Sequence, residues 1–239
     1  MGSDVKTRGC RQTARQRHES ALELCQRVLA IEAEGIQGMA QRVGAEFEQA
    51  VEMIFRSRGR VIVCGIGKSG LIARKIVATL NSTGTGAIFL HPVEAMHGDL
   101  GILTEGDVVL AISNSGETAE VCSLLPSVRH LGASLIAFTG AANSTLGRAA
   151  NLVIDVGVAK EACPLGLAPT ASTTAALAMG DALAVALLSR RKFNHADFRA
   201  LPPKADTKPA VALSADQLAR LTGTFAPDRR FRGIPDMER

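Results

Sequence analysis

Two polar turns, each directly after an apolar run, carry the side chains best suited to hold a phosphate. The first, residues 65–70, reads Gly-Ile-Gly-Lys-Ser-Gly and follows Val-Ile-Val-Cys. The second, residues 113–118, reads Ser-Asn-Ser-Gly-Glu-Thr and follows Val-Val-Leu-Ala-Ile. Hydroxyl groups and the backbone N–H groups that open a helix bind phosphate oxygens. The candidate phosphate-binding residues are therefore Ser69, Ser113, Asn114, Ser115 and Thr118.

The first turn alone also fits two nucleotide-binding patterns, and the residues around it disfavour both. Its Gly-x-Gly-x-x-Gly spacing matches dinucleotide-binding turns, which need an acid about 20 residues on, at the end of the next strand. Here the apolar run 87–90 ends in His91-Pro92, and the nearest acid is Glu94. A P-loop would need glycine where Ile62 stands. An NAD-dependent oxidoreductase remains a distant alternative.

The elements that must position these turns follow from the apolar periodicity. Short β-branched runs begin near residues 61, 87, 108, 134 and 152, and helical patterns are expected at 71–80, 118–130, 145–149 and 170–190. Residues 11–58 are helical in pattern, with a turn expected at Gly35 or Gly38. Alternating strands and helices predict an α/β fold with a parallel sheet covered on both faces.

Composition excludes several classes of protein. Aromatic residues make up 3% of the 239 and include no Trp or Tyr, which argues against a surface that stacks nucleic-acid bases. The net charge of +4 comes from Lys and Arg near the two ends. Five cysteines without a C-x-x-C pair suit a reducing cytosol and offer no zinc site. The most apolar stretch, 175–188, is interrupted by Gly180-Asp181 and is interpreted as a buried helix, so we expect a cytoplasmic protein that binds neither membrane nor nucleic acid.

Four segments in the same order resemble the sugar isomerase (SIS) domain family, and within it the arabinose-5-phosphate isomerases. The segments are residues 65–70, 91–101, 111–117 and 159–170, with 172–174 and 179–182 behind them. The resemblance runs from about residue 20 to residue 201 and implies a three-layer α-β-α fold with a five-stranded flavodoxin-like parallel sheet. It also implies a homodimer or homotetramer that works without a cofactor. Such enzymes interconvert D-arabinose 5-phosphate and D-ribulose 5-phosphate, which supplies Kdo for lipopolysaccharide.

The resemblance also suggests acid–base roles, each with a simpler alternative. Moving a carbonyl between C1 and C2 needs a base for a carbon-bound proton and donors for the enediolate. Glu161 is the implied base, although it could merely pair with Lys160. Glu120 is a second acid–base candidate, or only a favourable charge near a helix start. Lys68 could contact the ligand or lie on the surface, and His97 could relay a proton or be structural. No metal is expected.

The resemblance stops at Pro202, where family members continue with a His-Pro-Gly-Gly segment, and tandem CBS modules found in many relatives are absent. We therefore expect a truncated or frame-shifted end and slower turnover. The domain organisation predicted is a basic head at 1–15, the SIS domain at 16–201 and a divergent tail at 202–239. Two alternatives stay open: a catalytically impaired phosphosugar-binding module that senses ligand or scaffolds an oligomer, and a hexulose-6-phosphate isomerase.

Overall fold

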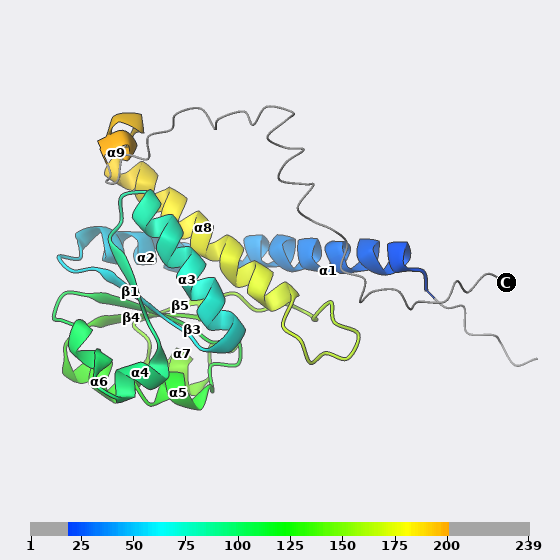
Figure 1. Cartoon of the computed structure of the whole chain (residues 1–239), viewed down its shortest axis with the longest axis horizontal. Coiled ribbons are helices and arrows are strands. Elements are labelled where there is room, and N and C mark those ends of the chain that lie inside the picture. Colours follow the sequence, from blue (N-terminus) through cyan, green and yellow to red (C-terminus); the bar gives the residue numbers. More distant parts are fainter. Residues whose placement is uncertain (1–18, 201–239) are drawn as a thin grey trace, which may run out of the picture. The chain divides into compact units, whose positions relative to one another are not determined.

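The computed structural model describes residues 19–200 (Figure 1). The chain divides into two units, Met1–Phe198 and Arg199–Arg239, and only Arg199 and Ala200 of the second unit are described. The predicted head at 1–15 and tail at 202–239 lie outside the described residues, so both remain predictions.

Five parallel strands form one sheet in the order β2-β1-β3-β4-β5. Their bounds are β1 Val61–Cys64, β2 Ala87–Leu90, β3 Val108–Ile112, β4 Ser134–Thr139 and β5 Leu152–Asp155. Each strand begins at the residue where the apolar pattern predicts it. The chain leaves β1 toward β2 on one side and returns to β3 on the other, as in flavodoxin-like sheets. The predicted α/β fold is confirmed.

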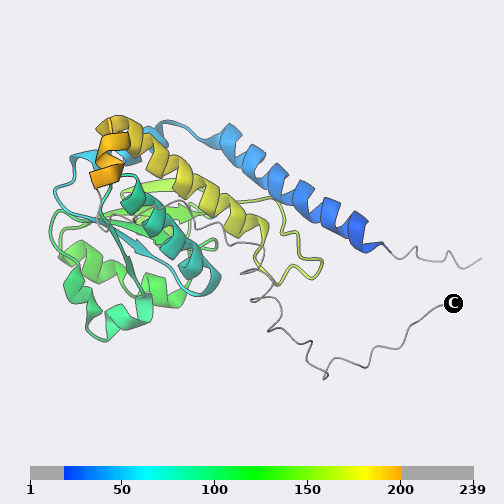
Figure 2. The ribbon, with the colours of Figure 1, turned by 45° about the horizontal axis from the view of Figure 1, so that its top comes forward.

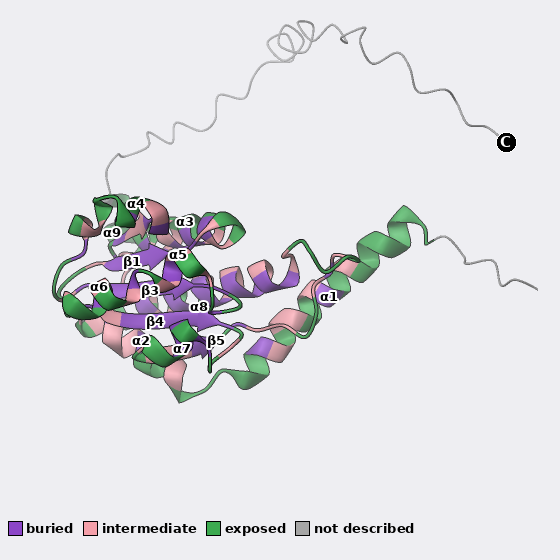
Figure 3. Cartoon of the chain, turned by 90° about the horizontal axis from the view of Figure 1, so that it is seen from below, coloured by how far each residue is buried: buried purple, intermediate pink, exposed green. Residues whose placement is uncertain are grey.

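Helices cover both faces of this sheet, and alternate strand residues point to opposite faces. On one face Val63, Leu110 and Phe138 pack against α2 (Ala45–Arg56), α3 (Gly67–Ser82) and α8 (Ala171–Arg191). On the other face Ile62 and Ala137 pack against shorter helices. The shorter helices are α4 Pro92–Met96, α5 Ala119–Cys122, α6 Leu125–His130 and α7 Thr145–Ala149, with a 3₁₀ turn at Asp99–Ile102. The three central strands β1, β3 and β4 are buried almost throughout (Figure 3), which explains their continuous apolar runs, whereas the edge strands β2 and β5 are only partly buried.

The predicted turn at Gly35 or Gly38 is wrong. Both glycines lie inside α1, which spans Ala21–Arg42, and the chain turns instead at Val43 and Gly44 before α2. A Cβ on Gly35 would lie 3.1 Å from a methyl of Val158, so this glycine serves close packing and not a turn. Helix α1 runs beside α8 (Figure 2).

The helical pattern at 118–130 forms two short helices, α5 and α6, and not one. Pro126 stands in the first turn of α6 and has no N–H to donate to the carbonyl of Cys122 four residues earlier. A single helix through this region would lose that hydrogen bond and force the proline ring against the same carbonyl.

Helix α8 is the one helix within residues 19–200 that is long and apolar enough to cross a bilayer. Half of its most apolar stretch lies inside the protein, where α8 packs against α1, α2 and α3. A Cβ on Gly180 would lie 2.3 Å from Cδ1 of Ile76, so α8 and α3 are in close contact at this point. Its apolar composition is that of a core helix.

Helix α9, His195–Ala200, completes the described elements.

Candidate active site

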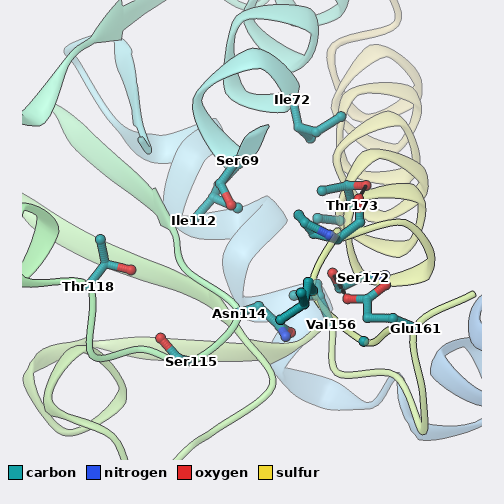
Figure 4. A pocket seen from close by; sticks show the side chains of 14 residues that line it. Ser69, Ile72, Ile112, Asn114, Ser115, Thr118, Val156, Glu161, Ser172 and Thr173 are labelled. Carbon is teal, nitrogen blue, oxygen red and sulfur yellow. Dashed lines mark hydrogen bonds between the residues drawn. The ribbon is translucent and has the colours of Figure 1, made fainter. Parts of the chain in front are cut away.

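A pocket of about 310 Å³ lies at the C-terminal edge of the sheet. Ile112 ends β3 and Val156 follows β5, and both line it. Its polar lining residues are Ser69, Asn114, Ser115, Thr118, Glu161, Ser172 and Thr173. Figure 4 shows Ser115 and Thr118 on one side of the pocket and Glu161 and Ser172 on the other. Parallel sheets hold ligands at this edge, where the strand order reverses.

The second polar turn is closed by its own hydrogen bonds. The N–H of Gly116 donates to the carbonyl of Ser113 at 3.0 Å and to its hydroxyl at 3.1 Å. The Ser113 hydroxyl also lies 2.7 Å from that of Thr118, and Ser113 is 2% exposed. Ser113 therefore holds the turn from within, whereas Asn114 and Ser115 are exposed toward the pocket.

Helix α5, which follows this turn, is only four residues long. The sequence pattern predicts a longer helix here, whose opening N–H groups would favour an anion. A helix of one turn has a small dipole, and the N–H groups of Gly116 and Glu117 donate within the turn. The side chains of Asn114, Ser115 and Thr118, which line the pocket, are therefore the donors on this side.

The first polar turn enters α3 earlier than the periodicity predicts. The helix begins at Gly67, so Lys68 and Ser69 occupy its first turn, where backbone N–H groups have no intrahelical acceptor. Ser69 lines the pocket. A Cβ on Gly70 would lie 2.8 Å from the carbonyl oxygen of Gly65. Close packing of α3 against the end of β1 thus explains the last glycine of the Gly-x-Gly-x-x-Gly pattern. No bound dinucleotide is needed to account for it.

The Glu161 carboxylate is held by the first turn of α8. Oε2 accepts hydrogen bonds from the N–H of Thr170 at 2.7 Å, its hydroxyl at 3.0 Å and the N–H of Ser172 at 3.3 Å. Oε1 accepts a short hydrogen bond from the hydroxyl of Ser172. Burial by itself raises the pKa of the Glu161 carboxyl, but the hydrogen bonds from Ser172 and Thr170 outweigh it and leave the pKa below its ordinary value. Glu161 is therefore ionised at neutral pH.

The loop that carries Glu161 is anchored by α1. Ala162 is 1% exposed and packs with Ile31 of α1 and Ala171 of α8. Lys160 lies 4.0 Å from Glu34 of α1, so its ion pair is with that helix. The simpler interpretation of Glu161 as a partner of Lys160 is therefore not what the structure shows.

The structure brings five of the predicted site residues into the pocket lining and leaves four out of it. Ser69, Asn114, Ser115, Thr118 and Glu161 line it, and Ser113 lies behind the second turn. The other three lie elsewhere: Lys68 is exposed in the first turn of α3, Glu120 is half-buried on α5, and His97 is exposed at the end of α4.

Sequence reasoning missed Thr170 and Ser172 as part of the site. Both residue types are common helix caps, and local rules would assign them to bind the backbone of their own helix. Instead Thr170, the N-cap of α8, makes no side-chain cap, and the carboxylate of Glu161 accepts the N–H groups there. The nearest signal in the sequence is the spacing of Glu161 from Thr170 and Ser172, which follow it after a loop that contains proline and glycine.

Within residues 19–200 no three His, Cys, Asp or Glu side chains gather closely enough to hold a metal ion. The expectation of a site without metal or cofactor stays a prediction.

The strand order and the pocket at the sheet edge define a flavodoxin-like domain, in which ligands bind where the strand order reverses. Residues 53–186 match the SIS domain family, and the chain belongs to that family. It is 51% identical over 173 residues to "Arabinose 5-phosphate isomerase KdsD" of Pseudomonas aeruginosa, covering 72% of this chain and 53% of that protein. It is 50% identical over 205 residues to the protein of the same name from Yersinia pestis, covering 84% of this chain and 61% of that protein.

Solved structures agree with this assignment. A protein of E. coli CFT073, c3406, solved in complex with arabinose 5-phosphate, superimposes with a TM-score of 0.72 at 42% identity, covering 74% of this chain and 94% of that one. The chain spans between about half and two thirds of the length of the two curated relatives.

Proposed function

We propose that this protein is an aldose–ketose isomerase that interconverts D-arabinose 5-phosphate and D-ribulose 5-phosphate through an enediolate, a reaction that supplies lipopolysaccharide sugars. One observation carries the proposal: a single pocket joins two polar turns suited to a phosphate with the ionised carboxylate of Glu161. The names of the relatives and the sugar phosphate bound in the E. coli structure support the choice of substrate.

In the proposed mechanism the phosphate binds between Ser69 and the 113–118 turn and orients the sugar. Glu161 removes the proton from the carbon next to the carbonyl, and the C–H electron pair forms the enediolate. The same proton then returns to the neighbouring carbon, so the reaction consumes no oxidant or reductant. A second group must move the proton between O1 and O2. Lys68, Glu120 and His97 are the proposed candidates for this role and for stabilising the enediolate.

A second candidate function is phosphosugar binding without turnover, as in a sensor or a scaffold. It is favoured by the position of Lys68, Glu120 and His97, none of which lines the pocket of the described chain. A third, isomerisation of a hexulose 6-phosphate, would use the same pocket with a longer sugar.

Incubation with arabinose 5-phosphate, followed by NMR for ribulose 5-phosphate, tests the first proposal. Thermal shift with the same sugar, with hexulose 6-phosphate and with NAD separates the others. Conversion is the expected result. A thermal shift without conversion would favour the binding module, and a shift with NAD alone would contradict all the sugar-phosphate proposals.

Ser115→Ala is expected to raise KM for arabinose 5-phosphate about tenfold with little change in kcat, because a lost phosphate contact weakens substrate and transition state alike. Initial rates over a range of substrate concentrations measure this. Ser82→Ala is a matched control, because Ser82 is exposed at the far end of α3 and its hydroxyl bonds only the carbonyl of Ala78 at 2.8 Å. An unchanged KM in Ser115→Ala would place the phosphate elsewhere.

We also propose that the protein is a cytoplasmic homodimer or homotetramer. The phosphate charge keeps such a substrate from crossing a bilayer unaided. On α1, Leu22 and Leu29 are 67% and 63% exposed and stand seven residues apart, which places them on one face of the helix. Figure 3 shows that the first half of α1 is largely exposed. A second copy of this chain would bury that face.

The double variant Leu22→Glu/Leu29→Glu is expected to reduce the molar mass measured by light scattering to that of one chain. Buried charges without partners oppose association. Gln41→Glu/Gln49→Glu adds the same charge at two exposed positions away from this face, one near the end of α1 and one on α2, and should leave the mass unchanged. If both double variants keep the wild-type mass, this face of α1 is not the interface.

A further inference from the structure

The two oxygens of the Glu161 carboxylate have unequal surroundings. Oε2 accepts three hydrogen bonds, two from Thr170 and one from the N–H of Ser172, whereas Oε1 accepts one, from the hydroxyl of Ser172. A carboxylate oxygen has about two lone-pair sites. Oε2 is therefore fully occupied by donors, and Oε1 keeps a free lone pair.

The hydroxyl of Thr170 is fixed from both sides. It accepts a hydrogen bond from the N–H of Ala162 at 2.8 Å and donates its own proton to Oε2 at 3.0 Å. Ala162 is itself buried against α1 and α8. The backbone next to Glu161 and the carboxylate are thus tied to the same side chain, which restricts rotation of the glutamate.

The hydroxyl of Ser172 lies where the pocket and the carboxylate meet. Ser172 is 5% exposed, lines the pocket and has its proton engaged by Oε1. Figure 4 shows its side chain next to that of Glu161. Thr173 also lines the pocket, but its hydroxyl donates to the backbone carbonyl of Thr170 at 2.8 Å and not to the carboxylate of Glu161.

We infer that Thr170 and Ser172 are positioning residues of the isomerase: they hold Glu161 so that Oε1, and not Oε2, receives the proton from the sugar carbon. The inference rests on the proposed function. When Oε1 takes the proton, the carbon keeps the electron pair as part of the enediolate, and the hydrogen bonds to Oε2 stay in place. Oε1 returns the proton to the adjacent carbon, so the carboxylate does not reorient during the reaction.

Ser172→Ala tests the inference by two independent readouts. The first is the pKa of Glu161, measured by carbon-13 NMR titration of labelled glutamate carboxyls. Removing a donor from the ionised form raises this pKa, by about one unit for a hydrogen bond to a charged group. The second readout is the pH dependence of kcat/KM. Because Glu161 acts as a base when ionised, a raised pKa moves the acid limb to higher pH by the same amount.

At neutral pH we expect kcat of Ser172→Ala to fall about tenfold while KM changes less than about threefold, because orientation of the base matters mainly in the transition state. Ser172→Thr keeps a hydroxyl and should restore both the pKa and the acid limb. Thr170→Val and Thr170→Ser form a second pair with the same expectation, and Val keeps the shape of Thr.

Thr174→Val controls for loss of any hydroxyl near the start of α8. The Thr174 hydroxyl donates to Glu32 of α1 at 3.1 Å and is not among the hydrogen-bond donors to Glu161, so its loss should leave the pKa and the acid limb unchanged. An unchanged pKa of Glu161 in Ser172→Ala overturns the inference whether or not the protein is active. A raised pKa with an unmoved acid limb also overturns it, because Glu161 is then not the base. Conversion of arabinose 5-phosphate by the wild type decides the proposed function separately.

Discussion

Glu161→Gln is expected to lower kcat for arabinose 5-phosphate isomerisation by about 10³-fold, within the range for loss of a general base. The amide of Gln cannot accept a proton from carbon at neutral pH, although it fills nearly the same space. KM should change little, because the proposed phosphate-binding residues Ser115 and Thr118 lie on the other side of the pocket. Steady-state kinetics, with exchange of the C2 proton into deuterated water as a second measurement, gives the result.

The same substitution should destabilise the fold modestly. Glu161 accepts the N–H groups at the start of α8, and an amide in its place must present either its oxygen or its NH₂ group to those donors. We expect a loss of about 1–2 kcal/mol in the free energy of unfolding, measured by urea denaturation at unchanged m-value. Because hydrogen bonds lower the pKa of Glu161 in the folded state, this stabilisation is present at neutral pH and lost in wild type as acid protonates the carboxyl.

Glu34→Gln is the matched control for both measurements. Glu34 is exposed on α1, and its ion pair with Lys160 has a separation of 4.0 Å, so neither the rate nor the stability should change measurably. If Glu161→Gln keeps a rate within threefold of wild type, Glu161 serves only to cap α8 and another group is the base.

Gly116→Ala is expected to have the largest effect on stability and to abolish phosphosugar binding. Gly116 has φ of +65°, and a Cβ at this position would lie 1.9 Å from the hydroxyl oxygen of Ser144 and 2.5 Å from its Cβ. Ser144 is 5% exposed and caps α7, so it cannot move aside. Left-handed strain of about 1–2 kcal/mol and overpacking of about 1–3 kcal/mol together predict a loss of about 2–5 kcal/mol. Thermal and urea unfolding measure it.

Gly67→Ala separates the cost of a left-handed backbone at alanine from the cost of the collision between the added Cβ and Ser144. Gly67 has nearly the same φ, +59°, but no atom lies within 4 Å of the added Cβ, so only the strain should appear. In the double variant Gly116→Ala/Ser144→Gly the collision with Ser144 is removed, and part of the lost stability should return. Equal destabilisation by Gly116→Ala and Gly67→Ala would show that the contact with Ser144 carries no weight.

The helices and strands predicted from the sequence are correct where local chemistry alone decides the structure. All five strands begin at the expected residues because β-branched runs between polar turns have few other ways to bury both faces. One error arises where packing competes with local preference: Gly35 resembles a turn residue, but contact with Val158 keeps it within α1. The helical pattern at 118–130 is the opposite case, because Pro126 lacks an N–H and a local rule for proline already indicates the break between α5 and α6.

The amino-acid sequence by itself determined the succession of strands and helices along the chain and the positions of the two polar turns. It also determined which residue types are available to bind phosphate or transfer protons. Apolar periodicity and turn chemistry act over a few residues, so they can be read without the fold. Only the tertiary structure decided which of these groups meet. Strand order brings the 113–118 turn to Ser69, and anchoring by α1 brings Glu161 to Ser172, while Lys68, Glu120 and His97 lie outside the pocket lining. Such contacts depend on packing between segments far apart in the chain, which no local pattern encodes.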